Sequence, residues 1–166
     1  MNIRPLTAEH AGEVITIQRA AYLQEARRYG AWDLPPLVET LDEISDHLRD
    51  GTPALGAFDG PRLVGSVRSR IDGDRMEVAR LSVAPDVQGA GVGRRLLEAI
   101  SAQAPAEITV VWLFTGAESD GNLRFYESAG FVRAAEHLDA VGIRCVTLEK
   151  KVISRSGAGH ETLAGF

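Results

Sequence analysis

The sequence predicts a single α/β domain built on one mixed, mostly antiparallel sheet with helices on both faces. The main observation is a change of hydrophobic period: two helical segments come first, three alternating segments follow, and then helices and strands alternate. A strand–helix–strand unit makes its two strands parallel, whereas strands joined by tight turns are antiparallel. The length of 166 residues, 45% of them hydrophobic, suffices for one core and not for two full domains.

Local sequence signals mark where the expected helices and strands begin and end. A capping box at Thr40 and Glu43 begins one helix, and the Asp-Gly pairs at 59–60 and 72–73 are typical hairpin turns. Segments with alternating or β-branched apolar residues are the expected strands: 3–6, 54–59, 63–72, 75–83, 107–114, 131–138 and 142–151. Segments with apolar residues three and four positions apart are the expected helices: one between Thr7 and Gly30, and others over 40–51, 94–104 and 121–129.

Composition predicts one globular domain, residues 1–151, followed by a mobile tail over 152–166. The formal charge is -5 and no basic cluster offsets it, so no nucleic-acid partner is expected. No apolar run reaches the ~18 residues of a membrane span, and the N-terminus lacks the apolar core of a signal peptide. No membrane partner is therefore expected, and the cytoplasm is the default location. The single cysteine, Cys145, lies in an alternating apolar stretch, which indicates a buried strand residue.

A glycine-rich turn, Gln88-Gly89-Ala90-Gly91-Val92-Gly93, lies between an expected strand and an expected helix. Glycines let the backbone turn tightly and direct several N–H groups at one point, and the positive end of the helix dipole attracts an anion to that point. Arg94 and Arg95 follow at once and supply charge for a phosphate group. The turn therefore predicts an anion site.

Several ligands compete for this turn. The dinucleotide fingerprint G-x-G-x-x-G fails because its third glycine comes one residue early, at Gly93, and no acidic residue lies about 20 positions on. A mononucleotide P-loop needs Gly-Lys-Ser/Thr, which is absent from the sequence. Glycines that only shape a turn explain neither their alternation nor the two arginines. The pyrophosphate of another cofactor is the remaining candidate.

Three sequence blocks together resemble the GNAT superfamily of acetyl-CoA-dependent N-acetyltransferases. The core of its signature, Arg/Gln-x-x-Gly-x-Gly/Ala, is matched by Gln88, Gly91 and Gly93. An L-x-V-x-P lead and a Tyr-x-x-x-Gly-Phe block are matched by further residues: Leu81, Val83, Pro85, Tyr126, Gly130 and Phe131. The blocks follow the family's order on the expected elements, and the resemblance covers residues 77–131.

The resemblance implies acetyl-CoA as the acyl-donor substrate and no metal. Backbone N–H groups of the glycine-rich turn and the next residue would hold the CoA pyrophosphate: Gln88, Gly89, Ala90, Gly91, Val92, Gly93 and Arg94. In the family, the fourth strand carries a bulge and splays from the fifth. Unpaired main-chain groups of Leu81, Ser82 and Val83 would therefore bind the pantetheine arm and polarise the thioester carbonyl.

Two catalytic residues are also implied. Tyr126 matches the family tyrosine that can give a proton to the leaving CoA thiolate, although a tyrosine on an amphipathic helix also packs as an ordinary aromatic. Glu77 lies where certain relatives carry a glutamate that accepts the amine proton, often through water. Arg75 and Arg80 lie close to it in the sequence and could instead pair with it as on an ordinary strand surface.

One departure from the family pattern concerns the pantetheine contact. Many members have asparagine seven residues before the tyrosine, where this chain has Ser119, and its asparagine is Asn122. Asn122 and Tyr126 share one helical face by their spacing. Either Ser119 caps the helix and contacts CoA, or Asn122 takes the contact.

In the family, the acceptor pocket is formed largely by the region between the first two helices, here roughly 22–43, together with the last hairpin. This region holds residues that would suit a cationic or partly aromatic amine: Tyr29, Trp32, Asp33 and Glu39. Most of its acidic residues can equally form a solvated helix face.

The resemblance predicts transfer of an acetyl group to a primary amine by direct attack on the thioester. The acceptor would be a small molecule or a peptide, and the protein a monomer or homodimer. An acyl-CoA-binding sensor or a degenerate domain without catalysis is the alternative, against which the intact Tyr126 argues.

Overall fold

The structure is a computed structural model and describes residues 1–153. Its strands are β1 (Asn2–Pro5), β2 (Ala54–Asp59), β3 (Arg62–Asp72), β4 (Arg75–Val83), β5 (Val110–Gly116), β6 (Val132–Leu138) and β7 (Arg144–Lys151). Its α-helices are α1 (Ala11–Tyr29), α2 (Pro35–Val38), α3 (Leu41–Arg49), α4 (Val92–Ala102) and α5 (Asp120–Ser128), with 3-10 turns η1 (Ala8–His10) and η2 (Pro85–Val87). The tail predicted over 152–166 lies outside the described residues from 154 onward.

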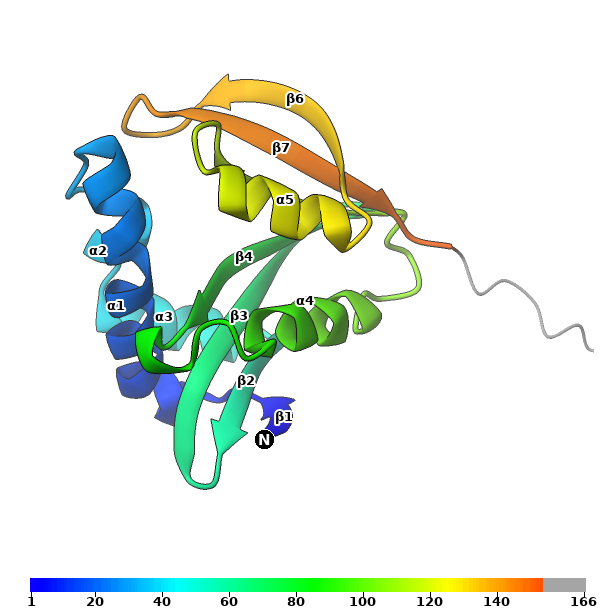
Figure 1. Ribbon diagram of the computed structural model, residues 1–166. Coiled ribbons are helices and arrows are strands. Elements are labelled where there is room, and N and C mark those ends of the chain that lie inside the picture. The colour runs from blue at the N-terminus through cyan, green and yellow to red at the C-terminus, as the bar shows by residue number, and fades with distance from the viewer. Residues whose placement is uncertain (154–166) are drawn as a thin grey trace, which may run out of the picture.

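One sheet contains all these strands in the order β1-β2-β3-β4-β5-β7-β6 (Figure 1). Neighbouring strands are antiparallel except β4 and β5, which are parallel because the chain crosses over through α4 between them. The predicted fold class, a mixed and mostly antiparallel sheet with helices, is confirmed.

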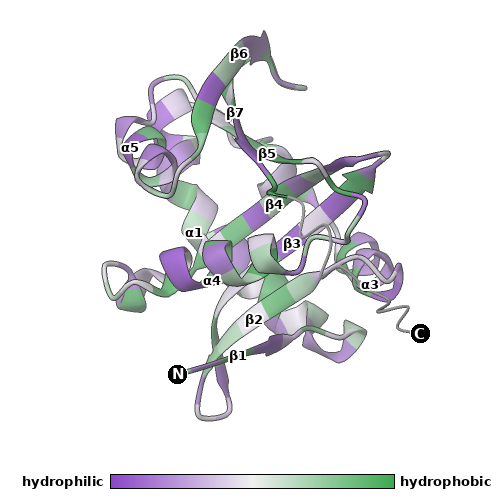
Figure 2. Cartoon of the chain, turned by 90° about the vertical axis from the view of Figure 1, so that its right-hand side faces the viewer, coloured by the Kyte–Doolittle hydropathy of each residue, from purple (hydrophilic) through white to green (hydrophobic). Residues whose placement is uncertain are grey.

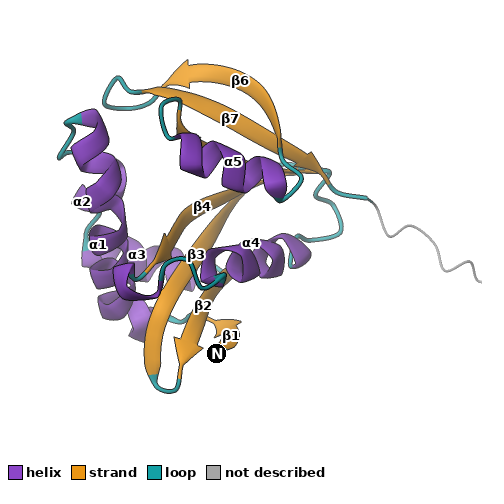
Figure 3. Cartoon of the chain, in the orientation of Figure 1, coloured by secondary structure: helices purple, strands orange, loops and turns teal. Residues whose placement is uncertain are grey.

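Helices cover both faces of the sheet (Figures 1 and 3). On one face α4 packs against β2, β3 and β4 through Leu96 and Ile100, and Leu123 of α5 joins the same core cluster. On the other face Val14 of α1 and Ile44 of α3 pack in a second cluster. Hydrophilic and hydrophobic bands alternate along β4 in Figure 2, because successive strand residues face opposite sides. No helix within residues 1–153 has the length and hydropathy needed to cross a bilayer.

The structure moves or adds some predicted boundaries. The short helix α2 lies between the first two predicted helices, where no element is expected. Its prolines, Pro35 and Pro36, are tolerated because they occupy its first turn, where a missing N–H costs nothing. Helix α4 begins at Val92, inside the glycine-rich turn, and not at Arg94. Strand β5 begins at Val110, since Ile108 closes a turn by donating its N–H to the Pro105 carbonyl while its side chain stays in the core.

Candidate active site

A gap in the sheet lies between the parallel strands β4 and β5. They pair only where residues 75–77 face residues 110–112, and beyond Glu77 the two strands diverge. The rest of β4 therefore presents backbone groups on this side that no strand partner satisfies. This is the splay that the family resemblance predicts, and the structure shows that it begins after Glu77.

A β-bulge bends β4 at the edge of this gap. Ser82 is paired with Ser66 and Ala79 with Arg68, so that Arg80 and Leu81 together lie opposite Val67. Arg80 adopts φ 56°, and it is the one non-glycine residue with positive φ among those described. An arginine in this conformation is strained, and such strain is typical of functional sites.

The glycine-rich turn follows β4 and ends on α4. Gly89 and Gly91 have φ of 84° and 82°, the left-handed region that favours glycine, and Gly91 is the N-cap of α4. The first N–H groups of the helix therefore point out of its exposed end without intrahelical partners. The Gln88 side chain donates to the Val83 carbonyl at 3.2 Å and holds the turn against the end of β4.

The splay, the turn, α1 and α5 enclose one cleft of about 880 Å³. Eleven of the sequence-predicted site residues line it: Glu77, Leu81, Val83, Gln88, Gly89, Gly91, Val92, Gly93, Arg94, Asn122 and Tyr126. Three do not: Ser82, Ala90 and Ser119. Ser82 is buried and its hydroxyl donates to the Arg80 carbonyl, which leaves only its main chain for the role predicted for it.

Tyr126 lies on α5 with its ring half-buried. It contacts Phe125 and Phe131 edge to face, at centroid distances of 5.1 and 6.3 Å. Burial raises the pKa of the Tyr126 hydroxyl well above its ordinary value, and the nearby Tyr22 and Glu25 raise it further. Among residues 1–153 this hydroxyl has no hydrogen-bond partner, so its proton is held and is available to a ligand in the cleft.

Glu77 is the last residue of β4 that pairs with β5. Its carboxylate lies 3.7 Å from the Arg70 guanidinium on β3, and its side chain is 13% exposed. The two arginines suggested by the sequence take other partners: Arg75 pairs with Glu149 and Arg80 with Glu39. Glu77 thus retains an accessible carboxylate at the closed end of the splay.

Ser119 is the N-cap residue of α5, but its side chain makes no capping bond. Its hydroxyl donates to Glu25 at 2.6 Å and accepts from the Tyr29 hydroxyl at 2.8 Å, which itself accepts from the Glu118 N–H at 3.0 Å. A Cβ on Gly116 would lie 2.0 Å from the Tyr29 oxygen, so only glycine allows this approach. These hydrogen bonds connect α1 to the start of α5, and they use both the donor and an acceptor position of the Ser119 hydroxyl.

Asn122 instead lies in the cleft wall, where its amide donates to the Thr115 hydroxyl at 3.2 Å. Of the two residues weighed for the pantetheine contact, only Asn122 faces the cleft. The amide oxygen of its side chain can accept a hydrogen bond from a ligand there.

The acceptor residues suggested by the sequence separate in the structure. Tyr29 lines the cleft, whereas Trp32 is 61% exposed and Asp33 is also exposed, and neither lines it. Tyr22, Glu25 and residues 137–140 of the last hairpin line the same cleft as Tyr29. Helical spacing from Tyr29 could have pointed to Tyr22 and Glu25, since residues three to four apart share a face.

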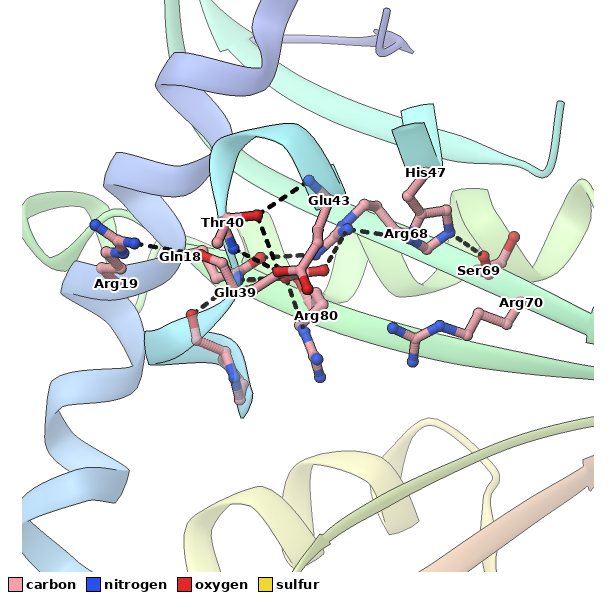
Figure 4. Close-up of polar contacts among 12 residues, drawn as sticks. Gln18, Arg19, Glu39, Thr40, Glu43, His47, Arg68, Ser69, Arg70 and Arg80 are labelled. Atoms are coloured by element: carbon pink, nitrogen blue, oxygen red, sulfur yellow. Dashed lines mark hydrogen bonds and ion pairs between the residues drawn. The ribbon is translucent and has the colours of Figure 1, made fainter. Parts of the chain in front are cut away.

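Glu39 belongs to a buried polar cluster and not to the cleft wall (Figure 4). Arg68 is fully buried and donates to both Glu39 oxygens, at 3.1 and 2.6 Å. Gln18, also buried, donates to Glu39 at 2.8 Å and accepts from Arg68 at 2.9 Å. Burial alone would raise the pKa of Glu39, but the hydrogen bonds from Arg68 and Gln18 lower it to about 2. The sequence did not reveal this cluster because Arg68 lies on a strand whose partners come from α1 and the α2–α3 loop.

His47 completes the cluster as a neutral side chain. Its Nε2 donates to the Ser69 carbonyl at 2.7 Å, which leaves Nδ1 to accept from Arg68 at 3.0 Å. Burial lowers the pKa of His47, and the charge of Arg68 lowers it further, whereas the hydrogen bond to the Ser69 carbonyl raises it. Protonation of His47 would break its contact with Arg68.

The cluster predicts a pH dependence of folding stability. Glu39 has a pKa of about 2 against an ordinary 4.5, so the unfolded chain binds more protons between these values. Its contribution, about 3 kcal/mol, is present above pH 4.5 and is lost as the pH falls through 2. We expect Glu39→Gln to lower the free energy of unfolding by about 3 kcal/mol at pH 7, with a deficit that shrinks toward pH 2.

Chemical denaturation across this pH range measures the effect. The control is Glu127→Gln, which removes the exposed ion pair between Glu127 and Arg133 and should cost less than about 1 kcal/mol. A deficit of Glu39→Gln that is equal at pH 3 and pH 7 would contradict the assignment.

Cys145 is buried on β7, as its sequence context indicates, and reaches the cleft wall. Burial raises the pKa of its thiol to about 11, and the nearby Asp139 and Glu25 act in the same direction. The thiol is therefore protonated at neutral pH and is a weak nucleophile.

Together these features define a class of protein: an α/β fold with splayed central strands whose gap opens beside a glycine-rich turn and the N-terminus of a helix. The sequence profile of the Acetyltransferase (GNAT) family matches residues 14–131, and the chain belongs to this family. The fold and family together make it an acyltransferase of the acetyltransferase type. No curated protein matches the chain.

Solved structures share the whole fold. The PaiA N-acetyltransferase from Thermoplasma acidophilum, in complex with coenzyme A, is 20% identical with a TM-score of 0.73, over 91% of this chain and 98% of its own. The ribosomal-protein-S18-alanine N-acetyltransferase from Escherichia coli is 17% identical with a TM-score of 0.73, over 96% and 97%. A probable acetyltransferase from Staphylococcus epidermidis ATCC 12228 is 18% identical with a TM-score of 0.76, over 92% and 99%.

Proposed function

We propose that the protein transfers an acetyl group from acetyl-CoA to a primary amine, by direct attack of the amine on the thioester. The observation that carries the proposal is one cleft into which the N-terminus of α4, the unpaired backbone of β4 and the free Tyr126 hydroxyl all open. These are the groups that would bind a pyrophosphate, an amide-rich arm and a leaving thiolate.

The turn and α4 would bind the phosphates of the donor. Backbone N–H groups from Gln88 to Arg94 supply the hydrogen bonds, and the positive φ of Gly89 and Gly91 leaves the turn without side chains in their way. The Arg94 guanidinium lies beside α5, donating to the Ser128 hydroxyl at 2.5 Å, and adds positive charge to this end of the cleft. Binding would thus depend on main-chain geometry more than on any one side chain.

Residues 81–83 of β4 would hold the acyl end. Leu81 belongs to the bulge and the next two residues follow it; their main-chain groups have no partner on β5 and would pair with the pantetheine amides as a strand would. An N–H in this stretch would donate to the thioester oxygen and stabilise the charge that develops on it. Asn122 of α5 also lines the cleft and would contribute a further polar contact.

Two side chains would move protons. Glu77 would accept a proton from the acceptor amine, directly or through water, because an amine with a pKa near ~10.4 must lose a proton before it attacks. Tyr126 would donate its proton to the sulfur as the C–S bond breaks. Its raised pKa keeps it protonated at neutral pH, which a proton donor requires.

A panel of amines tests the proposal. Simple primary amines, polyamines, amino acids and peptides with free N-termini are incubated with acetyl-CoA, and free thiol is followed. We expect thiol release that depends on one acceptor class and an acetylated product by mass spectrometry. Measurable CoA binding without release for any acceptor would contradict catalysis and support a CoA-binding sensor in its place.

A further inference from the structure

Arg80 occupies a place that neither catalysis nor donor binding explains. It lies at the bulge of β4, with its backbone in the left-handed region, and its side chain is 14% exposed. The large cleft and a smaller neighbouring cavity of about 480 Å³ share two lining residues, Arg80 and Pro35. Arg80 therefore lies at the junction of the two cavities, across from the α1–α2 wall.

Two arginines, Arg68 and Arg80, contact the one carboxylate of Glu39 in the buried cluster. Glu39 is the carboxylate within it, and Arg68 already binds both Glu39 oxygens. Arg80 adds a second guanidinium, which reaches Glu39 only through Nε at 3.3 Å. Arg68 thus satisfies both Glu39 oxygens by itself, and His47 is held neutral beside it. The accessible guanidinium of the pair is that of Arg80, because Arg68 is fully enclosed.

The terminal N–H groups of the Arg80 guanidinium are available to a ligand in the cleft. Among the described residues, its two terminal nitrogens have no hydrogen-bond partner, and they are not enclosed, since Arg68 Nε is the one buried side-chain atom left without a partner. Figure 4 shows the Arg80 guanidinium at the edge of the cluster, directed away from Arg68. A planar fork of this kind matches a carboxylate with two parallel hydrogen bonds.

A negative charge lines the same cleft as Arg80. It belongs to Glu25 on α1, which has one oxygen bonded to Ser119. Tyr22 lies near both charges: burial raises the pKa of its hydroxyl, Arg80 lowers it and Glu25 raises it. Positive and negative groups near one aromatic side chain of the cleft suit a ligand that carries both charges.

We propose that Arg80 binds a carboxylate of the acceptor, so that the acceptor class is a small amine that also bears a carboxylate, such as a free amino acid. This inference rests on the proposed amine acetylation and specifies its substrate. Of the carboxylates in the cleft wall, Glu77 pairs with Arg70 and Glu25 accepts from Ser119, so neither is bonded to Arg80. Glu43 and Asp50, which line the smaller cavity, are bonded to Thr40 and Thr52.

Matched acceptors test the inference. The twenty common L-amino acids and their α-amides have nearly the same shape and differ in the charge of one group. Wild-type kcat/KM should favour the best amino acid over its amide by about 10- to 100-fold, as for a hydrogen bond to a charged group. Arg80→Gln should remove this preference, mainly through KM for the amino acid, and leave the amide and the Kd of CoA within about twofold. Arg80→Lys should be intermediate.

The control is Arg75→Gln on the same strand, whose arginine pairs with Glu149 and lines neither cavity. It should leave all constants within about twofold. Equal loss of activity toward amino acid and amide in Arg80→Gln, with a lowered Tm, would show a structural role and overturn the inference. So would turnover of other amines when no amino acid reacts. The proposed function fails separately, by the absence of thiol release with any amine.

Discussion

Tyr126→Phe is expected to lower kcat about 10²- to 10⁴-fold while leaving the affinity for acetyl-CoA nearly unchanged. The ring would keep its edge-to-face packing with Phe125 and Phe131, and removal of the hydroxyl would break no hydrogen bond among residues 1–153. What is lost is a proton that burial holds on the oxygen at neutral pH. The phenolic donor is therefore the only group of the cleft that this substitution removes.

The measurement is kcat on a proven acceptor together with the Kd of CoA by calorimetry. The rate deficit should shrink with an acyl donor whose thiol is more acidic, because a better leaving group needs less proton donation as the C–S bond breaks. Tyr22→Phe is the matched control, a second tyrosine of the same cleft with a raised pKa, and should change kcat less than about 10-fold. Wild-type turnover of Tyr126→Phe would make Tyr126 a packing residue and refute the mechanism.

Gly91→Leu should abolish acetyl-CoA binding, with Kd raised more than about 100-fold, and leave the fold intact. Gly91 is the N-cap of α4 at φ 82°, and a Cβ added there meets no protein atom within 4 Å. The new side chain would thus extend into the space that the pyrophosphate requires, beside the N–H groups that would bind it. Calorimetric titration with CoA measures the loss.

The control variant Gly73→Leu distinguishes an effect of backbone strain from an effect of blocked CoA binding. Gly73 lies in the β3–β4 turn at φ 59°, and an added Cβ again meets no atom within 4 Å. Both variants carry the cost of a side chain in the left-handed region, about 1–2 kcal/mol, but only Gly91 lines the cleft. Similar Kd values for the two variants would exclude the turn as the phosphate site.

The prediction of the fold from sequence succeeded where the signals are local. Strands β2 and β4 begin and end at the predicted residues, and the capping box of Thr40 and Glu43 forms at the start of α3. The boundaries that moved are those where local signals conflict with tertiary contacts. Ile108 has the apolar character of a strand residue, yet it lies in a turn because the core accepts its side chain from there.

The sequence by itself determined the period of each element, the crossover that makes β4 and β5 parallel, and the glycine-rich turn between a strand and a helix. These depend on residues close together in the chain, where spacing and backbone preference decide the outcome. Only the tertiary structure decided the partners of the charged groups. Glu39 joins Arg68 in a buried cluster, Ser119 turns to Glu25, and Arg80 faces the cleft. Such pairings join residues far apart in sequence. Sequence spacing does not show which charged residue will find which partner, and burial and packing in the folded chain decide it.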